Sequence, residues 1–466
     1  MKKLRWVMDG ESWELDTSTP RTLEGEARAV PGEPLPLGIS RGTKLSRPRQ
    51  LDFFQRFMAV PFLVSFSSPS HGFSLQRVLT LPSTSNWFAT FLGQFNLQKF
   101  VSSLKHDEDS QSSSALHRMG RHLLDKSLYA LGFCSELLLT PDDTLLFSLD
   151  TYGHSRKSRK KAVFHHKFPC HNFTAEAAWP ALFVDDLGNY WDVPVSFAMD
   201  LASVGVSESG FSYHLCMQHN EGLPKPFEAD QSSQVPAALL PGTSMKGAFS
   251  FKKDVEFWRS KAQKLKMVQP FDMFLSNPHI SASGIIGAAL RACIGENSTR
   301  LQVEDDTQGS KGLFLHAPVV KSSLLADLFA SATFTAQYGN FQRLFLDLTR
   351  FHARLDFPSG SKCLLGAHQL ALDLLNSQQP NLGAVNAICP NVTISLQQQI
   401  AGPFSFRVDS GVALDWKNKD WNVEVDVKEP VFAVEYALHV LGSAKAIAWY
   451  SPKHQEFMVE LRFYET

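Results

Sequence analysis

Residues 457–464 read FMVELRFY, and this short stretch decides the fold class. Apolar side chains occupy every odd position, whereas Glu460 and Arg462 stand between them. Because successive side chains of a β-strand point to opposite faces, the alternation predicts a strand with one apolar face. The sequence ends two residues later, and a final strand that is aromatic near its end is typical of the strand that seals a closed barrel. A soluble sandwich can also end on a strand, so we take this as one argument for a barrel among several.

The same period of two recurs along most of the chain. In residues 87–98, WFATFLGQFNLQ, Phe91 and Phe95 alternate with Thr90 and Gln94. Further alternating runs lie at 73–81, 129–149, 193–217, 332–357 and 404–416. With about ten residues for each membrane strand plus turns, roughly 16 to 20 strands are expected. The sequence therefore predicts an all-β fold, an antiparallel transmembrane β-barrel with short helical and loop insertions.

Two segments interrupt this pattern with apolar residues at helical spacing. Residues 115–126, ALHRMGRHLLDK, place leucine and methionine on one face of a helix and basic side chains on the other. Residues 362–377, KCLLGAHQLALDLLNS, also carry leucine and alanine at helical spacing. We expect both as helical insertions between barrel strands, and we expect polar loops at 105–114 and 225–236.

Residues 1–64 are predicted to form a separate unit, either at the mouth of the barrel or as a plug. Asp9 and Gly10 are a favoured hairpin turn between two short alternating runs. The segment 31–50 is basic and rich in proline and glycine, which indicates irregular structure. The apolar stretch 51–64 fits a short helix or a plug-like insert. Residues 65–466 are assigned to the barrel.

The charge balance excludes a protein that is drawn as a whole to a polyanion. Lysine plus arginine number 45 and aspartate plus glutamate 46, so the formal net charge is −1 and nucleic acid is not an expected partner. No run of 18 apolar residues predicts a membrane helix. The start, MKKLRWVMDG, is followed by further acidic residues and predicts neither a secretory signal nor a transit peptide. The six scattered cysteines are therefore expected to be reduced.

Several common motifs of enzymes and metal sites are absent. The chain contains no GxGxxG, no Gly-Lys dipeptide of a phosphate loop and no HExxH. The nearest group of metal-ligand types is His165, His166, Cys170 and His171, but adjacent strand residues point to opposite faces and Pro169 interrupts the run. A second row of polar residues comprises Asp347, Arg350, His352, Arg354 and Asp356; charge that faces a barrel lumen is ordinary. We predict no catalytic residues, no metal and no cofactor.

Three basic clusters are the candidate binding residues. The first is a proline-broken loop with Arg41, Lys44, Arg47 and Arg49; the second is the basic helix face with Arg118, Arg121 and Lys126; the third is Arg156, Lys157, Arg159, Lys160 and Lys161. Each cation near an anionic lipid surface contributes about 1 kcal/mol of binding free energy, so an anionic lipid head group is the expected ligand. For the third cluster, a solvated loop between two strands is an equally good interpretation.

Five longer runs resemble one family of plant proteins. They are LPLGISRGTKLSRPRQ (35–50), KSLYALGFCSELLLTPDDTLLFS (126–148), FTAQYGNFQRLFLDLTRFHARLDFPSG (334–360), LQQQIAGPFSFRV (396–408) and YSPKHQEFMVELRFYET (450–466). These runs are similar to the chloroplast outer-envelope β-barrel of the trigalactosyldiacylglycerol lipid-import pathway. The similarity spans nearly the whole chain, but it identifies no set of lipid ligands.

The resemblance implies a function and a set of partners. The function is non-enzymatic transfer of glycerolipid, phosphatidic acid or a close derivative, from the endoplasmic reticulum across the outer envelope, in support of galactolipid synthesis. The partners are an inner-envelope lipid permease with substrate-binding and ATPase subunits, and contact sites with the endoplasmic reticulum; a monomer and a homodimer are both left open. Two alternatives remain: a soluble or peripheral lipid-binding β-groove carrier, and a lipid-modifying enzyme.

Overall fold

The computed structural model describes twenty segments of the 466 residues. They are 27–29, 43–44, 63–67, 72–84, 86–106, 115–152, 158–185, 190–203, 210–226, 235, 239–257, 278–294, 313–317, 322–339, 344–357, 359–376, 382–416, 423–438, 444–452 and 455–465. The predicted hairpin at Asp9 and residues 51–62 of the predicted helix or plug lie outside these segments, and residues 63–64 belong to a strand.

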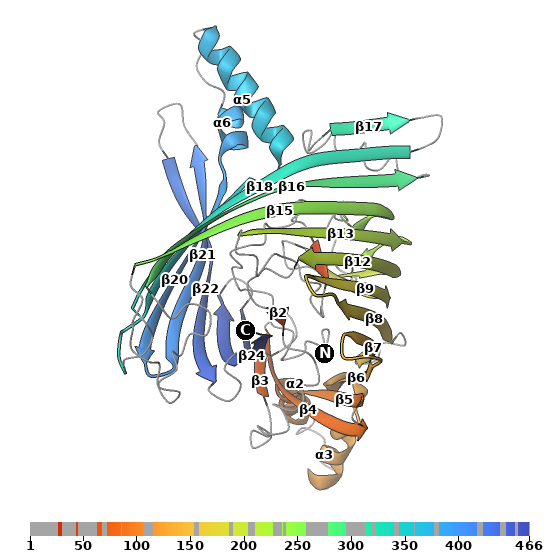
Figure 1. Cartoon of the computed structure of the whole chain (residues 1–466). Helices are drawn as coiled ribbons and strands as arrows, with labels where there is room; N and C mark the ends of the chain where they lie inside the picture. Colours follow the sequence, from red (N-terminus) through yellow and green to blue (C-terminus); the bar gives the residue numbers. More distant parts are fainter. Residues whose placement is uncertain are drawn as a thin grey trace.

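The wall of the molecule is one antiparallel sheet whose strands pair largely in chain order (Figure 1). Its strands are β3 (Leu63–Ser67), β4 (Gly72–Thr84), β5 (Trp87–Asn96), β6 (Tyr129–Leu138), β7 (Asp143–Tyr152), β8 (Arg159–Lys167), β9 (His171–Trp179), β12 (Val195–Ser203), β13 (Phe211–Glu221), β15 (Gly242–Glu256), β16 (His279–Ile294), β18 (Ser322–Tyr338), β19 (Thr349–Phe357), β20 (Asn391–Ala401), β21 (Phe404–Trp416), β22 (Val423–Leu438), β23 (Ala444–Ser451) and β24 (Glu456–Glu465). Each pairs with the next in this order. The prediction of an antiparallel all-β fold is therefore confirmed.

The strand order returns to its start through a short seam. β24 pairs with β3 at Glu456↔Ser67, Phe457↔Phe66 and Met458↔Ser65, and β3 pairs with β4, so the pairings form a closed circuit. Two short strands extend this wall: β2 (Thr43–Lys44) pairs with the end of β24, and β17 (Leu313–Ala317) pairs with the start of β18. The number of strands lies within the predicted range.

Close packing on the inner face depends on a glycine. Ala248 of β15, Ile285 of β16 and Phe329 of β18 form a buried apolar cluster. A Cβ added at Gly287 would lie 2.1 Å from Cζ of Phe329, so only glycine leaves room for this ring. Gly287, one of many small residues in β16, HISASGIIGAALRACI, thus has a packing reason.

Two helical insertions lie where helices were predicted, and one of them is longer than expected. Between β5 and β6 the chain forms α2 (Leu97–His106), α3 (Ala115–Leu123) and the 3-10 turn η1 (Lys126–Leu128). Between β19 and β20 it forms α5 (Gly360–Leu375) and α6 (Leu382–Ile388). α2 was not expected. In the described segments, no helix combines the length and the apolar character that a membrane crossing requires.

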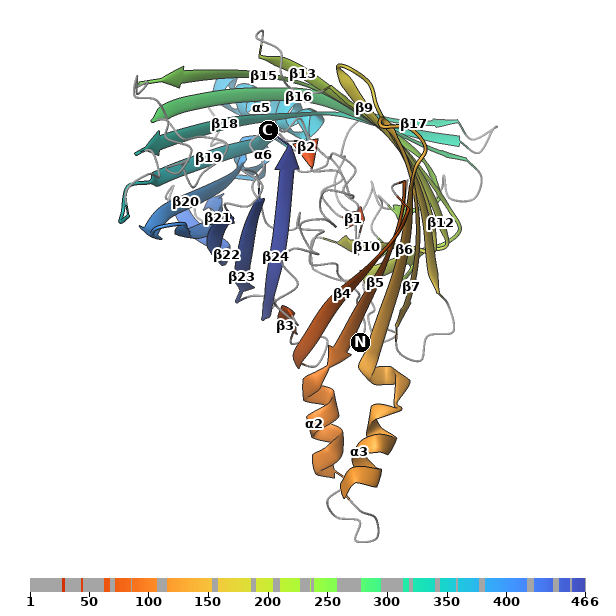
Figure 2. The same ribbon diagram turned by 60° about the horizontal axis from the view of Figure 1, so that its bottom comes forward.

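All the large described insertions leave the wall at the same edge. Alternate strands run in opposite directions, and β5, β7, β9, β13, β16 and β19 run in the same direction in the circuit. The connections that follow these strands hold the helices, β17 and strands of a second, smaller sheet, and we call this side the insertion edge. The other side, the turn edge, includes the tight connections at 139–142, 168–170 and 402–403. Figures 1 and 2 show the two helical insertions projecting from separate parts of the molecule.

A second, four-stranded sheet lies inside the wall (Figure 2). This inner sheet has the order β1 (Ala27–Ala29), β10 (Ala181–Asp185), β11 (Tyr190–Val193) and β14 (Lys225–Pro226). Trp191 and Val193 are fully buried in a cluster with Phe183 of β10 and Ala178 of the wall strand β9. The inner sheet is therefore packed against the inner face of the wall, and it includes a piece of the N-terminal region.

Candidate functional site: the wall, its interior and the basic helix

Large apolar side chains cover the outside of the wall. On almost every strand at least one is exposed, and we call the following set the outer belt: Phe73, Phe91, Leu131, Phe147, Trp179, Phe197, Leu215, Phe249, Ile286, Phe334, Phe351, Leu396, Phe406, Val434 and Tyr450. Phe249 is 66% and Ile286 69% exposed. Exposed aromatic and branched side chains on this scale need a partner phase that is not water.

Polar and charged side chains cover the inside. In β5, Thr90, Gln94 and Asn96 are buried on the inner face, whereas Phe91 is exposed on the outer face. The alternation of residues 87–98 predicted this arrangement. The same inner face carries buried Glu136, Asp150, Arg159, Thr174, Asp200, His214, Ser250, Ser283, Arg291, Thr333, Arg354, Gln397, Arg407 and Glu435. The interior is therefore polar while the exterior is apolar, which inverts the arrangement of a soluble protein.

A polar network crosses the inner faces of β18 to β22. Arg350 donates from Nη1 to Oε1 of Gln397 (3.0 Å) and from Nη2 to Oε1 of Gln337 (3.0 Å). Gln397 donates from Nε2 to Oε2 of Glu435 (3.2 Å). Glu435 in turn accepts from Nη1 of Arg407 (2.6 Å). Because each charge has a neighbour of opposite sign or an amide partner, the network holds its charges in place rather than offering a free cation.

The predicted polar row of β19 lies on the same inner face, and its Arg350 belongs to this network. Arg350, His352, Arg354 and Asp356 all lie on the inner face, as expected for charge that faces a lumen. Nδ1 of His352 lies 2.9 Å from the hydroxyl of Thr335, and Nε of Arg354 donates to Oδ1 of Asp356 at 2.8 Å. Asp347 precedes the strand in the turn.

A second charged group lies beneath the inner sheet. Arg159 of β8 is buried and forms an ion pair with Asp192 of β11, so it ties the inner sheet to the wall. Lys161 pairs with Glu176 of β9 at 3.0 Å. Further along, the buried Asp200 of β12 pairs with Nε2 of His214 at 2.6 Å.

The third basic cluster is therefore split by the start of a strand. Arg159 and Lys161 turn to the interior and pair with carboxylates, whereas Lys160 points outward and is exposed. Arg156 and Lys157 lie outside the described segments. An irregular loop could present these cations on one surface. In β8, successive side chains point to opposite faces, so Arg159 and Lys161 lie on one face and Lys160 on the other.

The second basic cluster lies on an exposed helical hairpin at the insertion edge. Arg121 and Lys126 are exposed, and Arg118 belongs to α3, although its side chain is not among those described. The neighbouring helix α2 adds Lys99 and the exposed Lys105, which sequence reasoning missed. Alternation that ran on to Gln98 hid this helix, but Phe100 and Leu104 at a spacing of four could have indicated it.

Contacts at its base fix this basic hairpin to the wall. Asn96 caps α2, since its Oδ1 accepts from the backbone N–H of Lys99 (2.9 Å). The ring of Phe95 lies 5.6 Å from Phe100 of α2 and 5.4 Å from Tyr129 of β6. The hydroxyl of Tyr129 donates to the carbonyl oxygen of Leu123 at 2.8 Å.

The first basic cluster is described only at one position. Lys44 lies in β2, where its backbone pairs with Tyr464 of β24. Arg41, Arg47 and Arg49 lie outside the described segments.

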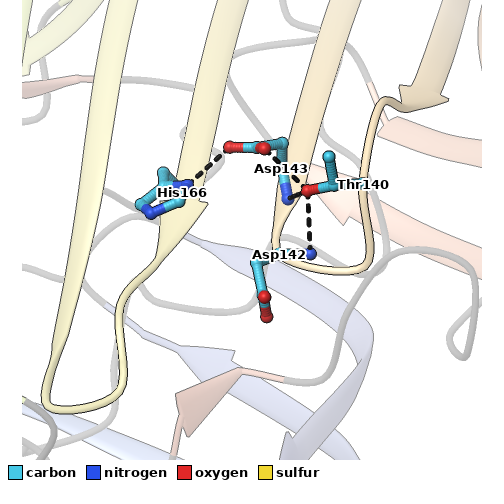
Figure 3. Close-up of polar contacts among 4 residues, drawn as sticks. All are labelled: Thr140, Asp142, Asp143 and His166. Atoms are coloured by element: carbon cyan, nitrogen blue, oxygen red, sulfur yellow. Dashed lines mark hydrogen bonds and ion pairs between the residues drawn. The ribbon is translucent and has the colours of Figure 1, made fainter.

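His166 forms a polar contact with Asp143 at the turn edge (Figure 3). His166 pairs with the carboxylate of Asp143, and Thr140 donates from its hydroxyl to Oδ2 of Asp143 at 2.6 Å. The Thr140 hydroxyl and, secondarily, His166 lower the pKa of Asp143. His165 lies instead against the hydroxyl of Thr174 at 3.0 Å. Across the described segments, no group of three metal-ligating side chains comes together.

Comparison with known proteins identifies the family. No protein-family model matches the chain. The chain is 55% identical over 482 aligned residues to Protein TRIGALACTOSYLDIACYLGLYCEROL 4, chloroplastic, of Arabidopsis thaliana, and the alignment covers 100% of both chains. Similarity of this extent confirms the resemblance seen in the five long sequence runs. The chain therefore belongs to the trigalactosyldiacylglycerol 4 family.

Proposed function

We propose that the protein is a non-enzymatic lipid-transfer barrel in the outer envelope membrane of the chloroplast. The observation that carries this proposal is the inverted burial of the wall, with the apolar outer belt exposed and polar side chains buried inside. Most wall strands have nine or more residues, the length that a tilted strand needs to cross a bilayer. A circuit of strand pairings also reduces the length of unpaired sheet edge that would face hydrocarbon.

Membership of the family supports a role in chloroplast lipid trafficking, because the Arabidopsis relative is named for a galactolipid and as chloroplastic. We propose that the cargo is glycerolipid, phosphatidic acid or a close derivative, which moves from the endoplasmic reticulum toward galactolipid synthesis. The partners in this scheme are an inner-envelope lipid permease with substrate-binding and ATPase subunits, at envelope contacts with the endoplasmic reticulum.

The basic hairpin α2–α3 is the proposed first contact for the lipid head group. It offers cations that no interior ion pair engages, namely Arg121, Lys126 and Lys105. Phosphatidic acid presents a phosphate monoester, a compact anion that arginine and lysine donors match well.

The paired charges of the interior would then line a polar path. Barrels of 16 to 18 strands enclose a channel, and larger ones are usually plugged. The inner sheet would occupy the position of such a plug.

Alkaline carbonate extraction of envelope membranes tests the central claim. A membrane-spanning barrel stays in the pellet, and the purified chain in detergent gives a β-rich circular dichroism spectrum. The alternative, a soluble or peripheral groove carrier, would pass to the supernatant. The spread of the outer belt over nearly all wall strands favours the barrel, since a groove would expose its apolar residues on one face only.

An enzyme is the other alternative, and one sequence pattern makes a test worthwhile. Residues 38–42, GISRG, match the GxSxG sequence pattern of a nucleophile elbow. That motif requires a strand followed directly by a helix. These residues lie outside the described segments. We expect the pure protein to leave added glycerolipid chemically unchanged, as judged by mass spectrometry. Turnover that Ser40→Ala abolishes would replace transfer by catalysis.

A further inference from the structure

The α5–α6 hairpin exposes an apolar face that the proposed conduit does not use. Five leucines of α5 are exposed: Leu364, Leu365, Leu372, Leu374 and Leu375. Leu364 is 67% and Leu375 80% exposed, which is more than most members of the outer belt. Helical spacing places Leu364, Leu365, Leu372 and Leu375 on the side of α5 opposite Gly366, which packs against α6, and we call this side the leucine face. Helical spacing places Leu364 and Leu375 almost in line along that side.

Packing and hydrogen bonds hold the hairpin at its start and at the crossing of its two helices. Gly366 packs against α6, where an added Cβ would lie 2.8 Å from the carbonyl oxygen of Ala384 and 3.0 Å from Cβ of Ala387. The start of α5 is held by β18: Asp327 accepts from the backbone N–H of Ser361 (3.0 Å) and from the hydroxyl of Ser359. Ser359 also caps the helix through the N–H of Lys362.

The segment is almost without charge. Between Lys362 and Arg407, Asp373 is the single aspartate, glutamate, lysine or arginine in the sequence. A charged protein surface or a head group would find little to pair with on this hairpin. Its complement is an apolar phase.

The place of the hairpin on the wall identifies that phase. The last pair between β18 and β19 is Ala330↔Phe357, but β18 continues eight residues beyond it, to Ser322. Leu324 and Leu328 on that extension are exposed, and so is Leu290 of the paired β16. Gly360, the first residue of α5, lies directly against Leu328. The leucine face of α5 therefore begins where the apolar exterior of the wall extends past β19.

We propose that the leucine face of the α5–α6 hairpin inserts among the acyl chains of the bilayer beside the wall, without recognising a head group. This inference rests on the proposed membrane-spanning barrel and adds a second kind of lipid contact to it. Burial of such a face in acyl chains follows from the hydrophobic effect alone, so it does not depend on lipid charge.

Photo-crosslinking of the full-length chain in pure phosphatidylcholine liposomes tests the proposal. A benzophenone amino acid is placed at Leu375, at Ile286 of the outer belt and at the exposed Lys126 of the basic hairpin. We expect lipid adducts at Leu375 within about threefold of Ile286 and about tenfold above Lys126, because a neutral bilayer does not attract the basic hairpin. The same label at Leu364 is a second variant should the first fail to fold. Mass spectrometry identifies the adducts.

Each contrary outcome has a separate meaning. A dimer adduct without lipid at Leu375 would assign the face to a second copy of the chain and overturn the inference. Lipid adducts at Ile286 with none at Leu375 and Leu364 would overturn it while leaving the membrane barrel intact. No lipid adducts at Ile286 would overturn the barrel and the inference together. A triple change, Leu364→Ser, Leu372→Ser and Leu375→Ser, should leave the Ile286 adduct unchanged and lower lipid protection of α5.

Discussion

Two helical hairpins rise from the same edge of the wall, and their surfaces are opposite in character. The α2–α3 hairpin carries Lys99, Lys105, Arg118, Arg121 and Lys126 in or directly after its helices. The α5–α6 hairpin carries a single lysine, Lys362, at its base and exposes five leucines. The first helix of each hairpin begins with an N-cap residue, Asn96 for α2 and Ser359 for α5. Their difference therefore lies in what they present and not in how they are held.

The difference separates two properties of a lipid molecule. A basic surface selects the head group, and its attraction falls as salt rises. A leucine surface selects the acyl chains and is insensitive to salt and to head-group charge. With the two proposed roles, the hairpins on one edge would divide recognition of an amphiphile between electrostatics and the hydrophobic effect.

Substitutions in the wall should have the largest effect, because the proposed roles of both hairpins assume that the wall lies in a bilayer. Ile286→Arg places a charge on the outer belt, which costs roughly 2–4 kcal/mol at mid-bilayer, or about 30- to 1,000-fold in the inserted fraction. Urea titration of the chain folded into liposomes measures this cost. Ile286→Met is the matched control and should fold like the wild type. Normal insertion of the arginine variant would break the comparison at its base.

The last wall strand offers a sharper version of the same test. Val459 pairs with Ala448 and Glu460 with the buried Ile447, so the register assigns adjacent residues of β24 to opposite faces. Val459→Arg should impair insertion strongly, whereas Glu460→Lys should be tolerated. A cysteine at position 459 should react with a lipid-phase probe but not with a water-soluble maleimide. Shielding from both reagents would mean that this strand packs against protein.

Charge reversal on the basic hairpin tests its half of the comparison. Arg118→Glu, Arg121→Glu and Lys126→Glu together should weaken binding to phosphatidic acid vesicles by about 3 kcal/mol, or about 100-fold, at about 1 kcal/mol for each cation. Co-sedimentation at rising salt gives the measurement, because an electrostatic contact weakens with ionic strength. The triple serine variant of α5 is the control and should keep both affinity and salt dependence. An affinity that ignores both the reversal and salt would refute the role of α3.

Removal of the caps should show that the two hairpins are held alike. Asn96→Ala and Ser359→Ala each remove a side-chain acceptor at a helix N-terminus, which costs about 1 kcal/mol of local stability. Hydrogen exchange should report faster opening of α2 in the first variant and of α5 in the second, with the other hairpin unchanged. If one loss opened both hairpins, they would form one cooperative unit and the comparison would need revision.

The smallest effect is expected at the turn edge, far from both hairpins along every strand. The pKa of Asp143 is lowered mainly by the Thr140 hydroxyl and then by His166. A carboxyl whose pKa is lowered in the folded state stabilises the fold at a pH above its pKa in the unfolded state. This stabilisation is lost as the pH falls through its pKa in the folded state. Thr140→Val should therefore raise the pKa of Asp143 more than His166→Gln does, as measured by carboxyl NMR in detergent. The reverse order would make the histidine the dominant partner.

Sequence patterns could predict the wall because each strand carries its own signal. Thr90, Gln94 and Asn96 alternate with Phe91 and Phe95, and burial follows that alternation residue by residue. The same period explains why the third basic cluster is divided between two faces, because successive residues of a strand point to opposite sides. Arg159 and Lys161 lie inside one.

The inner sheet and the leucine hairpin could not be predicted so directly. β10, ALFVD, and β11, YWDV, have the composition of wall strands, and nothing local says that they fold inward to pair with β1. The spacing of leucine in residues 362–377 predicted a helix, but only the tertiary structure shows which leucines remain exposed. Contacts distant in sequence decide both features.

The seam between β3 and β24 has a consequence for how the molecule is made. Ser67 and Glu456, which pair there, lie 389 positions apart in the sequence, whereas nearly every other wall strand pairs with a close neighbour. Closing so large a loop is entropically unfavourable and is slow compared with forming hairpins. In assembly by chain order, one edge of β3 stays unpaired until β24 is in place. An open strand edge is a template for aggregation, so a partner that covers this edge during assembly would oppose aggregation.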